Sequence, residues 1–253
     1  MLEFLFPALA SLLAGFIDAV AGGGGLVLLP ALFSAFPGAA PATLMGTNKG
    51  ASVWGTAWAT GQYLQRVQLD WRALAPAAVL SLAGSFLGAW LLTLTSPDGL
   101  RKALPWLLTG VLVYTLARKD LGRAHVPRFA GRAEQLAMAG IAGVVGFYDG
   151  FFGPGTGSFF VFLFVRVLGY DFLHASAAAK LMNLASNVAA ISLFAAKGHV
   201  WWPLAGVMAV TNVAGSLLGT RLALQHGAGF VRGVFVLVVT ALIVKTAWSA
   251  YGG

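Results

Sequence analysis

The sequence predicts an all-α polytopic membrane protein with two homologous halves, and three observations support this fold class. The 253 residues are 58% hydrophobic and only 9% charged, whereas soluble domains carry about 25% charged residues. Several apolar runs approach the roughly 20 residues that a helix needs to cross a bilayer. A glycine-rich motif also recurs in register 131 residues later. Uncharged runs of this length favour helices over a membrane barrel.

The two halves share one pattern at a constant spacing. The motif Gly-Phe-Ile-Asp ends at Asp18 and runs into a glycine cluster, as does Gly-Phe-Tyr-Asp, which ends at Asp149. The same spacing relates Lys49 to Lys180 without a gap. A duplicated acid, lysine and glycine break in apolar sequence is typical of a transporter with its site between two repeats. The predicted units are a first transmembrane repeat, a basic linker and a second transmembrane repeat, at residues 1–118, 119–132 and 133–253.

Each half is predicted to hold five apolar segments. In the first half they cover residues 4–21, 25–36, 41–64, 72–95 and 100–117. In the second half they cover residues 133–152, 156–168, 174–196, 202–224 and 230–249. All but the second segment of each half approach spanning length, which predicts four full spans plus a short glycine-broken helix per half. The irregular backbone at each break is expected to line a protein cavity, where its amides find partners.

The direction of the repeats stays open at this point. If the second segment of each half crosses the bilayer, the halves have five crossings and are inverted; if not, they have four and are parallel. Close packing of the fourth segments on a neighbour is predicted by two small-xxx-small faces, at Gly84 and Gly88 and at Gly215 and Gly219.

The net charge of +8 is best explained by membrane topology. The densest basic run, Arg118, Lys119, Arg123, Arg128 and Arg132, lies in the one long polar connection. The positive-inside rule therefore places the connection 118–132 in the cytoplasm. No nucleic-acid partner is expected, since aromatic and basic residues do not interleave as they do in nucleic-acid grooves. The expected surroundings are membrane lipid, and the sequence leaves the oligomeric state open, a homo-oligomer included.

Two lysines are predicted to lie deep in the membrane. Lys49 is about eight residues into its helix, hence about 12 Å deep in a hydrocarbon layer of about 30 Å. A lysine at that depth costs at least about 2.5–3.5 kcal/mol, so it must face a partner or water. Each lysine shares a helical face with polar residues. These are Ser52 and Thr56 in the first half, and Asn183 and Asn187 beside Lys180 in the second.

Two aspartates accompany the lysines, and they admit two interpretations. Asp18 and Asp149 lie deep in their helices, and their side chains are too short to reach the interface. In the first interpretation they pair with Lys49 and Lys180 as purely structural salt bridges. In the second, the lysines also attract an anionic substrate, while an aspartate balances charge or takes up a proton during transport.

The glycine breaks favour the second interpretation. A helix begins directly after each break, so its unpaired amides and positive dipole end face the break. Glycine lets the backbone approach a ligand closely, although the glycines could instead serve only tight helix packing. The candidate substrate-binding residues are Gly22, Gly23, Gly24, Gly25, Thr47, Asn48, Lys49, Ser52, Gly153, Gly155, Thr156, Gly157, Lys180, Asn183 and Asn187. The candidates for proton or charge coupling are Asp18 and Asp149.

Other chemistries lack support in the sequence. The chain has no cysteine, which excludes thiol catalysis, disulfides and thiolate metal sites. The four histidines are scattered without ligand spacing, so no metal site and no cofactor is expected. They are His125, His174, His199 and His226. No Walker loop or hydrolase motif is present, which argues against an enzyme.

These motifs resemble the TauE/SafE family of anion permeases, in particular its YfcA-like branch. The resemblance is carried by the stretch from Gly146 to Phe159, by Ala21 to Gly25, by Thr47-Asn48-Lys49, and by Lys180-Leu181-Met182-Asn183 with Asn187. It covers essentially the whole chain. It implies a secondary transporter of the bacterial inner membrane, with about eight helices in two repeated halves, that moves sulfite, sulfonates or related organosulfur anions.

The expected function combines both lines of reasoning. The residues predict a permease for a small oxyanion that works by alternating access and is coupled to protons or another ion. The resemblance narrows the anion to sulfite, an organosulfonate or a related sulfur compound. The alternatives are an uncoupled anion channel and a membrane assembly protein whose buried charges are structural only.

Overall fold

The computed structural model describes residues 2–94, 106, 109, 122 and 124–251, which form helices and no strand. The first group of helices comprises α1 (Leu2–Ala21), α2 (Gly25–Ala35), α3 (Pro41–Arg66) and α4 (Trp71–Leu92). The second comprises α6 (Arg132–Phe151), α7 (Thr156–Leu163) with the π-helical turn η1 (Phe164–Leu168), α8 (Phe172–Ala196) and α9 (Trp202–Tyr251). These bounds confirm the predicted segments to within a few residues. Nearly all of the predicted segment 100–117, and the basic residues Arg118, Lys119 and Arg123, lie outside the described residues.

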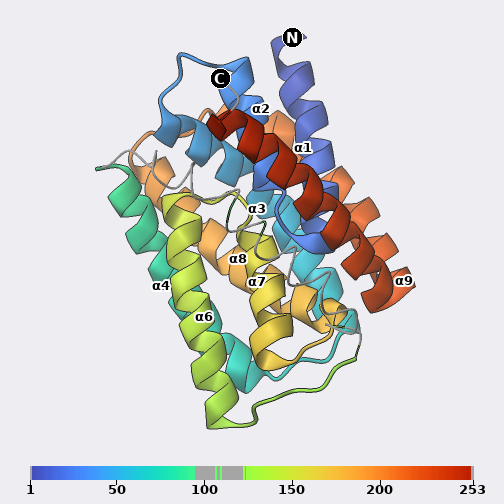
Figure 1. Cartoon of the computed structure of the whole chain (residues 1–253). Coiled ribbons are helices and arrows are strands. Elements are labelled where there is room, and N and C mark those ends of the chain that lie inside the picture. The colour runs from blue at the N-terminus through green and yellow to red at the C-terminus, as the bar shows by residue number, and fades with distance from the viewer. Residues whose placement is uncertain (1, 95–105, 107–108, 110–121, 123, 252–253) are drawn as a thin grey trace.

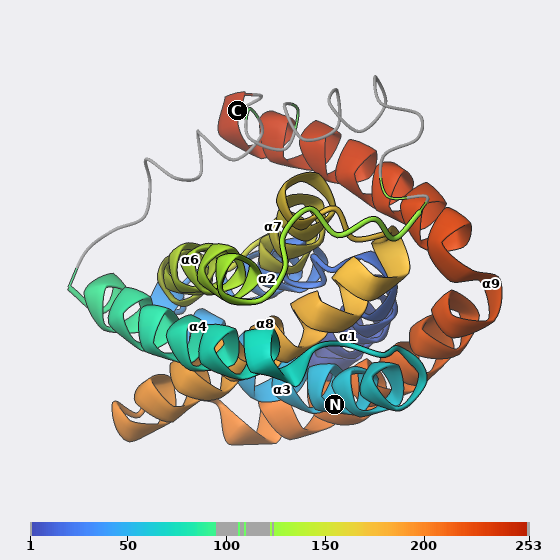
Figure 2. The same cartoon turned by 90° about the horizontal axis from the view of Figure 1, so that it is seen from below.

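Helix α9 contains the last two predicted segments of the second half. Its backbone leaves the helical conformation at Gly227, where φ is 70° and ψ is −162°. A positive φ is accessible to glycine at little steric cost, so the chain changes direction there. Figure 2 shows the two parts of α9 curving around one side of the molecule.

The protein is a multi-pass membrane protein. Among the described residues, four helical stretches are long and apolar enough to cross a bilayer. They are Phe4–Ala21, Trp71–Leu92, Phe172–Ala196 and Trp202–Ala241. Helices α3 and α6 reach 26 and 20 residues, but they carry more polar and charged residues, the predicted site residues of α3 among them. Within the described part of the chain, composition alone therefore identifies two stretches in each half, and the 40-residue stretch of α9 covers the fourth and most of the fifth predicted segment of the second half. The four full spans predicted for each half are not confirmed.

The second helix of each half is short, as predicted, and follows a glycine break. Helix α2 has 11 residues and packs on α1, and α7 has 8 residues and packs on α6. In Figure 1, α2 lies beside the upper part of α1, near the N-terminus, whereas α7 lies beside α6 in the lower half of the view. The breaks require glycine, because φ is positive at Gly22, Gly23, Gly153 and Gly155.

The glycine faces of the fourth segments bring helices into close contact, which confirms that packing prediction. Helix α4 lies on α6 and α9 lies on α1, in both cases with the two helices running in the same direction. A Cβ atom at any of the four glycines would overlap a backbone carbonyl of the neighbouring helix. The pairs are Gly84 with Gly143, Gly88 with Phe147, Gly215 with Leu12, and Gly219 with Phe16. The last two pairs repeat the first two at the 131-residue spacing.

Helices α3 and α8 cross each other at the centre in opposite directions. Going along α3, Gly46 lies against Phe194 and Gly50 against Ile191, while Thr56 accepts a hydrogen bond from Asn187. The partners on α8 thus appear in reverse order. Two serines at positions 131 residues apart, one on α4 and one on α9, contact these helices. Their hydroxyls donate 2.7 Å hydrogen bonds to backbone carbonyls. Ser85 donates to Ser186 and Ser216 donates to Gly55.

Replacing Gly215 by alanine tests the close packing of α9 on α1. The new methyl group would overlap the carbonyl oxygen of Leu12, and overpacking of this kind costs about 1–3 kcal/mol. We expect the thermal unfolding temperature of the detergent-solubilised protein to fall. The control is Gly206→Ala in the same helix, where a Cβ meets no heavy atom of the described residues within 4 Å. Equal melting temperatures for the two variants would contradict the packing.

Candidate functional site

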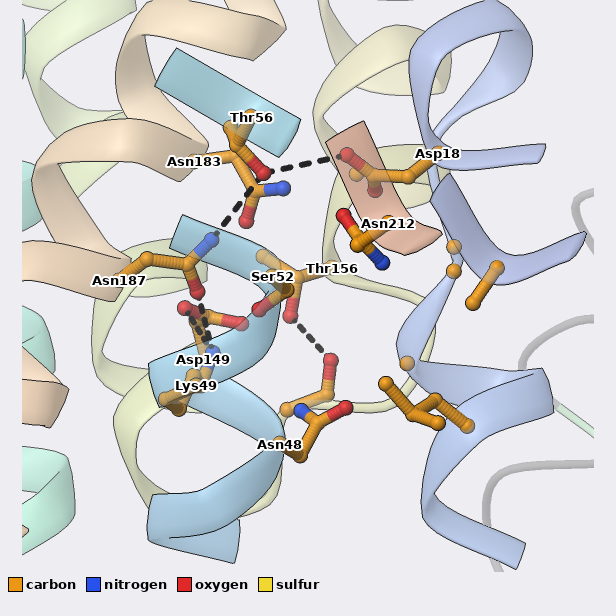
Figure 3. Close-up of a pocket in the computed structure, with 17 residues that line it drawn as sticks. Asp18, Asn48, Lys49, Ser52, Thr56, Asp149, Thr156, Asn183, Asn187 and Asn212 are labelled. Carbon is orange, nitrogen blue, oxygen red and sulfur yellow. Dashed lines mark hydrogen bonds and ion pairs between the residues drawn. The ribbon is translucent and has the colours of Figure 1, made fainter. Parts of the chain in front are cut away.

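The candidate site is a cavity at the centre of the molecule, where both glycine breaks meet α3 and α8 (Figure 3). Most of the predicted site residues line it. They are Gly23, Gly24, Gly25, Asn48, Lys49, Ser52, Gly153, Thr156, Gly157, Asn183 and Asn187, together with Asp18 and Asp149. The cavity measures about 30 Å³, which is room for the centres of roughly two water molecules. A larger solute therefore fits only if the surrounding groups move.

Lys49 is the cation of this cavity. Its Nζ lies 2.6 Å from Oδ2 of Asp149 and donates a 2.9 Å hydrogen bond to Oδ1 of Asn187. The side chains of Lys49 and Asp149 are only 4% and 2% exposed. Because a buried ammonium group without a partner is very unfavourable, Asp149 and Asn187 satisfy a charge that the apolar surroundings could not hold alone.

Lys180 has a different position, behind the cavity. It is fully buried, and its Nζ lies 3.6 Å from Oδ2 of Asp18 and donates a hydrogen bond to the backbone carbonyl of the same residue. Asp18 lines the cavity, whereas Lys180 does not. Of the two predicted lysines, Lys49 thus lines the cavity and Lys180 does not. Lys180 contacts the cavity wall only by pairing with Asp18.

Each ion pair joins the two halves of the sequence. Lys49 comes from α3 and pairs with Asp149 of α6, while Lys180 comes from α8 and pairs with Asp18 of α1. The partners in one pair are the 131-residue equivalents of the partners in the other. The sequence predicted the charged groups of both pairs but did not decide that the partners are exchanged between halves.

A chain of polar groups connects the two ion pairs. Asn187 already accepts from Lys49, and its Nδ2 donates to the Thr56 hydroxyl at 3.5 Å. The Thr56 hydroxyl in turn donates to Oδ2 of Asp18 at 3.4 Å. Thr56 and Asn187 occupy equivalent positions 131 residues apart, so the contact between them lies where the two halves face each other (Figure 3).

The glycine breaks form the opposite wall of the cavity. The two breaks touch each other, since a Cβ on Gly22 would overlap the backbone of Gly157. The Ser158 hydroxyl stabilises this contact by donating a 3.0 Å hydrogen bond to the carbonyl of Gly22. Helices α2 and α7 begin at Gly25 and Thr156, and the amides of Leu26, Val27 and Thr156 donate to carbonyls of the glycine breaks. Because both helix starts line the cavity, they present positive dipole ends to it.

Four predicted site residues lie outside the cavity lining: Lys180, Thr47, Gly22 and Gly155. Thr47 has a structural role, since its hydroxyl donates to the carbonyl of Thr43 at 2.7 Å and accepts from the amide of Trp201 at 3.0 Å. Two polar lining residues were not among the candidates: Thr56 and Asn212. The sequence places Thr56 on the same helical face as Lys49, but its spacing gives no sign that it connects the two ion pairs. Asn212 could have been noticed as a buried amide within an apolar run.

Among the fully buried side-chain atoms of the described residues, one that lines the cavity has no hydrogen-bond partner. Oδ1 of Asn48 is buried without a hydrogen bond, and the residue as a whole is only 3% exposed. A buried acceptor that is left unsatisfied costs about 1–3 kcal/mol. The cavity therefore retains an unused polar group beside Lys49, which a polar solute or water could satisfy.

The chain is similar to known membrane transporters over nearly its whole length. The family described as sulfite exporter TauE/SafE matches residues 7–246. The "probable membrane transporter protein YfcA" of Escherichia coli is 37% identical over 243 residues, which cover 96% of this chain and 88% of that protein. The "probable membrane transporter protein ORF9" of a Sinorhizobium species is 36% identical over 245 residues, which cover 97% and 92%. These names describe transporters and not enzymes.

A double-mutant cycle on Lys49 and Asp149 tests the central ion pair. Asp149→Leu alone leaves the ammonium group, and Lys49→Met alone leaves the carboxylate, buried without a counter-charge, which we expect to destabilise the protein by about 3–5 kcal/mol in each case. Combining Lys49→Met with Asp149→Leu should recover most of this loss, because no charge is then left unpaired. Melting temperatures in detergent measure both effects. The control is Lys197→Ala, whose exposed Nζ donates to the Thr93 hydroxyl. Additive losses in the double variant would show that the pair is not coupled.

Proposed function

The chain belongs to the TauE/SafE family of membrane transporters, and on this premise we propose that it is a secondary transporter for a small oxyanion in the bacterial inner membrane. The single observation that carries this proposal is the buried ion pair of Lys49 and Asp149 at the wall of the cavity. A lysine that only had to be neutralised would not need to line a cavity beside two helix starts. An anion in the cavity could replace Asp149 as the partner of the ammonium group.

The proposed binding step is an exchange of partners at Lys49. The anion accepts from the ammonium group that now contacts Asp149 at 2.6 Å. The positive dipole ends of α2 and α7 add further attraction, since helix N-termini favour negative charge. The Thr156 hydroxyl, which now donates to the carbonyl of Gly153 at 2.7 Å, lies close enough to the cavity to contribute another donor. A compact oxyanion has several acceptor oxygens, so it can accept hydrogen bonds from donors that approach from different helices.

Proton coupling follows from the same exchange. Once Lys49 turns to the anion, Asp149 is left as a buried carboxylate without a counter-charge, which is strongly unfavourable. Uptake of a proton by Asp149 neutralises the group and lets the anion and the proton share one occluded state. Asp18 occupies the equivalent position beside Lys180 and is the second candidate for this role.

Alternating access is supported by the opposed directions of α3 and α8 and by helix contacts that recur at the 131-residue spacing. We infer that residues 1–118 and 133–253 are inverted repeats, that 119–132 is the linker between them, and that the connection 118–132 faces the cytoplasm. Inverted repeats can exchange their conformations and so open a central site to either side in turn. A cavity of about 30 Å³ corresponds to a closed state of this cycle.

The proposed substrate class is a sulfur oxyanion: sulfite, an organosulfonate or a related compound. The matching family is described by its sulfite exporters, and the pyramidal or tetrahedral arrangement of oxygens in such anions suits donors that converge from several helices. The unpartnered oxygen of Asn48 is an acceptor at the wall that a protonated or hydroxylated member of this class could satisfy.

Transport assays in proteoliposomes test the role of the lysines. Lys49→Ala removes the cation of the cavity and Lys180→Ala leaves Asp18 without its counter-charge, so we expect the flux of sulfite or a sulfonate to fall to the background of empty vesicles in both. Lys197→Ala should transport normally. A monodisperse size-exclusion profile for each variant separates loss of transport from loss of folding. Unchanged flux in both lysine variants would refute the proposal. Flux that persists but ignores an imposed pH gradient would identify an uncoupled channel instead.

A thermal-shift screen tests the substrate class. A ligand present at about 100 times its dissociation constant stabilises the folded state by about 2.7 kcal/mol, and we expect this from sulfite, thiosulfate or a sulfonate more than from carboxylates. Lys49→Ala should lose the shift, and Lys197→Ala should keep it. If none of these anions changes the melting temperature of the unmodified protein, a membrane assembly protein with structural charges becomes the better account.

A further inference from the structure

A second group of ligand-type side chains lies apart from the cavity, where the segment before α6 meets the start of α8. It consists of His125, Asp171 and His174. One nitrogen or oxygen atom from each residue lies within 4.8 Å of the corresponding atoms of the other two. None of the three lines the central cavity. The expectation that the histidines are scattered is therefore wrong for His125 and His174, which are 49 positions apart in sequence and adjacent in space.

Asp171 holds His174 in a fixed orientation. Its Oδ1 accepts from the amide of His174 at 2.8 Å and so caps the N-terminus of α8. Its Oδ2 lies 2.7 Å from Nδ1 of the same histidine. A carboxylate this close to a ring nitrogen fixes the orientation of the ring, and a metal ion bound between the two atoms would take the place of the proton that they share. The imidazole of His174 is thus already positioned by its neighbour.

His125 is brought to this pair by the backbone of the connecting segment. The amide of Val126 donates to the carbonyl of Gly169 at 3.0 Å, and the amide of Arg128 donates to the carbonyl of Leu168 at 2.8 Å. The His125 ring stacks on the His174 ring, with 4.0 Å between the ring centroids. His125 is exposed and lies outside any helix, so its side chain can turn without disturbing the core.

We propose that His125, Asp171 and His174 form a binding site for a divalent transition-metal ion of the Zn²⁺ type. Two imidazole nitrogens and one carboxylate oxygen, with water as the fourth ligand, are a common donor set for such ions. Two nitrogen ligands favour Zn²⁺, Ni²⁺ or Cu²⁺ over Mg²⁺ and Ca²⁺. Bond lengths of about 2.0–2.2 Å place the ligand atoms about 3.3 Å apart. The present atoms lie within 4.8 Å of one another, so rotation of the exposed His125 ring must close a gap of at most about 1.5 Å.

A bound ion would join the connection between the two halves to the first turn of α8. The backbone hydrogen bonds of Val126 and Arg128 already hold the two segments together, and the metal would add a link between their side chains. Since α8 also carries Lys180, Asn183 and Asn187, the ion would anchor the helix that supplies a large part of the central site. It would not contact the transported anion.

Cobalt and zinc titrations of the full-length protein in detergent test this site, after removal of any affinity tag and treatment with a chelator. We expect one equivalent of Co²⁺ to give the visible absorption of a nitrogen- and oxygen-ligated ion, and Zn²⁺ to displace it. His125→Ala and His174→Ala should each weaken Zn²⁺ binding at least about tenfold. Asp171→Asn keeps the helix cap, because asparagine caps well, but should weaken binding too. His226→Ala, an exposed histidine elsewhere, is the control.

The outcomes separate the proposal from a purely structural role of the cluster. Saturating Zn²⁺ should raise the melting temperature of the unmodified protein and of His226→Ala, but not of His125→Ala. Equal affinity in all variants, or no saturable binding in the unmodified protein, would reduce the cluster to stacked rings and a helix cap. His125→Gln, at an exposed position, replaces the alanine variant if that variant does not fold. Anion flux should persist in His125→Ala, so this test can fail without affecting the proposed transport function.

Discussion

The structure depends on the need to neutralise two ammonium groups in the interior of a membrane protein. Lys49 and Lys180 are almost fully buried, and each contacts a carboxylate contributed by a helix from the other half of the sequence. Breaking such a pair leaves an uncompensated charge, which costs far more than the pair itself contributes. The two halves are therefore tied together by an electrostatic requirement that each meets with an aspartate of the other half. This requirement explains why α1 and α6 end at the centre of the molecule, beside α8 and α3.

Glycine contacts fix the helices that carry the two aspartates. Helices α1 and α6, which carry Asp18 and Asp149, pack closely against α9 and α4. Glycines at the contacts let backbone lie on backbone, as Gly88 does on Phe147 and Gly219 on Phe16. In the membrane this close packing also supplies dispersion attraction, where hydrophobic burial between helices contributes little. The same small residues thus serve both stability and the placement of charge.

Much of this arrangement could be predicted from the sequence, because apolar length and glycine position determine where helices begin and end. The segments, the interruption between residues 224 and 230, the close glycine faces and the polar residues around Lys49 all follow from local composition and from the repeat. The sequence could not decide which aspartate meets which lysine, since both pairings fit the same spacing. It also missed the link through Thr56 and the meeting of His125 with His174. Contacts between residues far apart in the chain leave no local pattern, and these were the contacts that only coordinates could supply.

The polar chain between the two ion pairs determines how a site of this kind can respond to a ligand. Asn187 accepts from Lys49 and donates to Thr56, and Thr56 donates to Asp18. If an anion draws Lys49 away from Asp149, as proposed, the oxygen of Asn187 loses its charged donor and the amide can reorient. That change reaches Asp18, and through it Lys180, by two hydrogen bonds. Longer bonds of 3.4–3.5 Å at Thr56 are weak enough to break and re-form. Under this proposal, two equivalent half-sites connected in this way would respond to one anion as a single unit, as a transporter that opens to one side at a time requires.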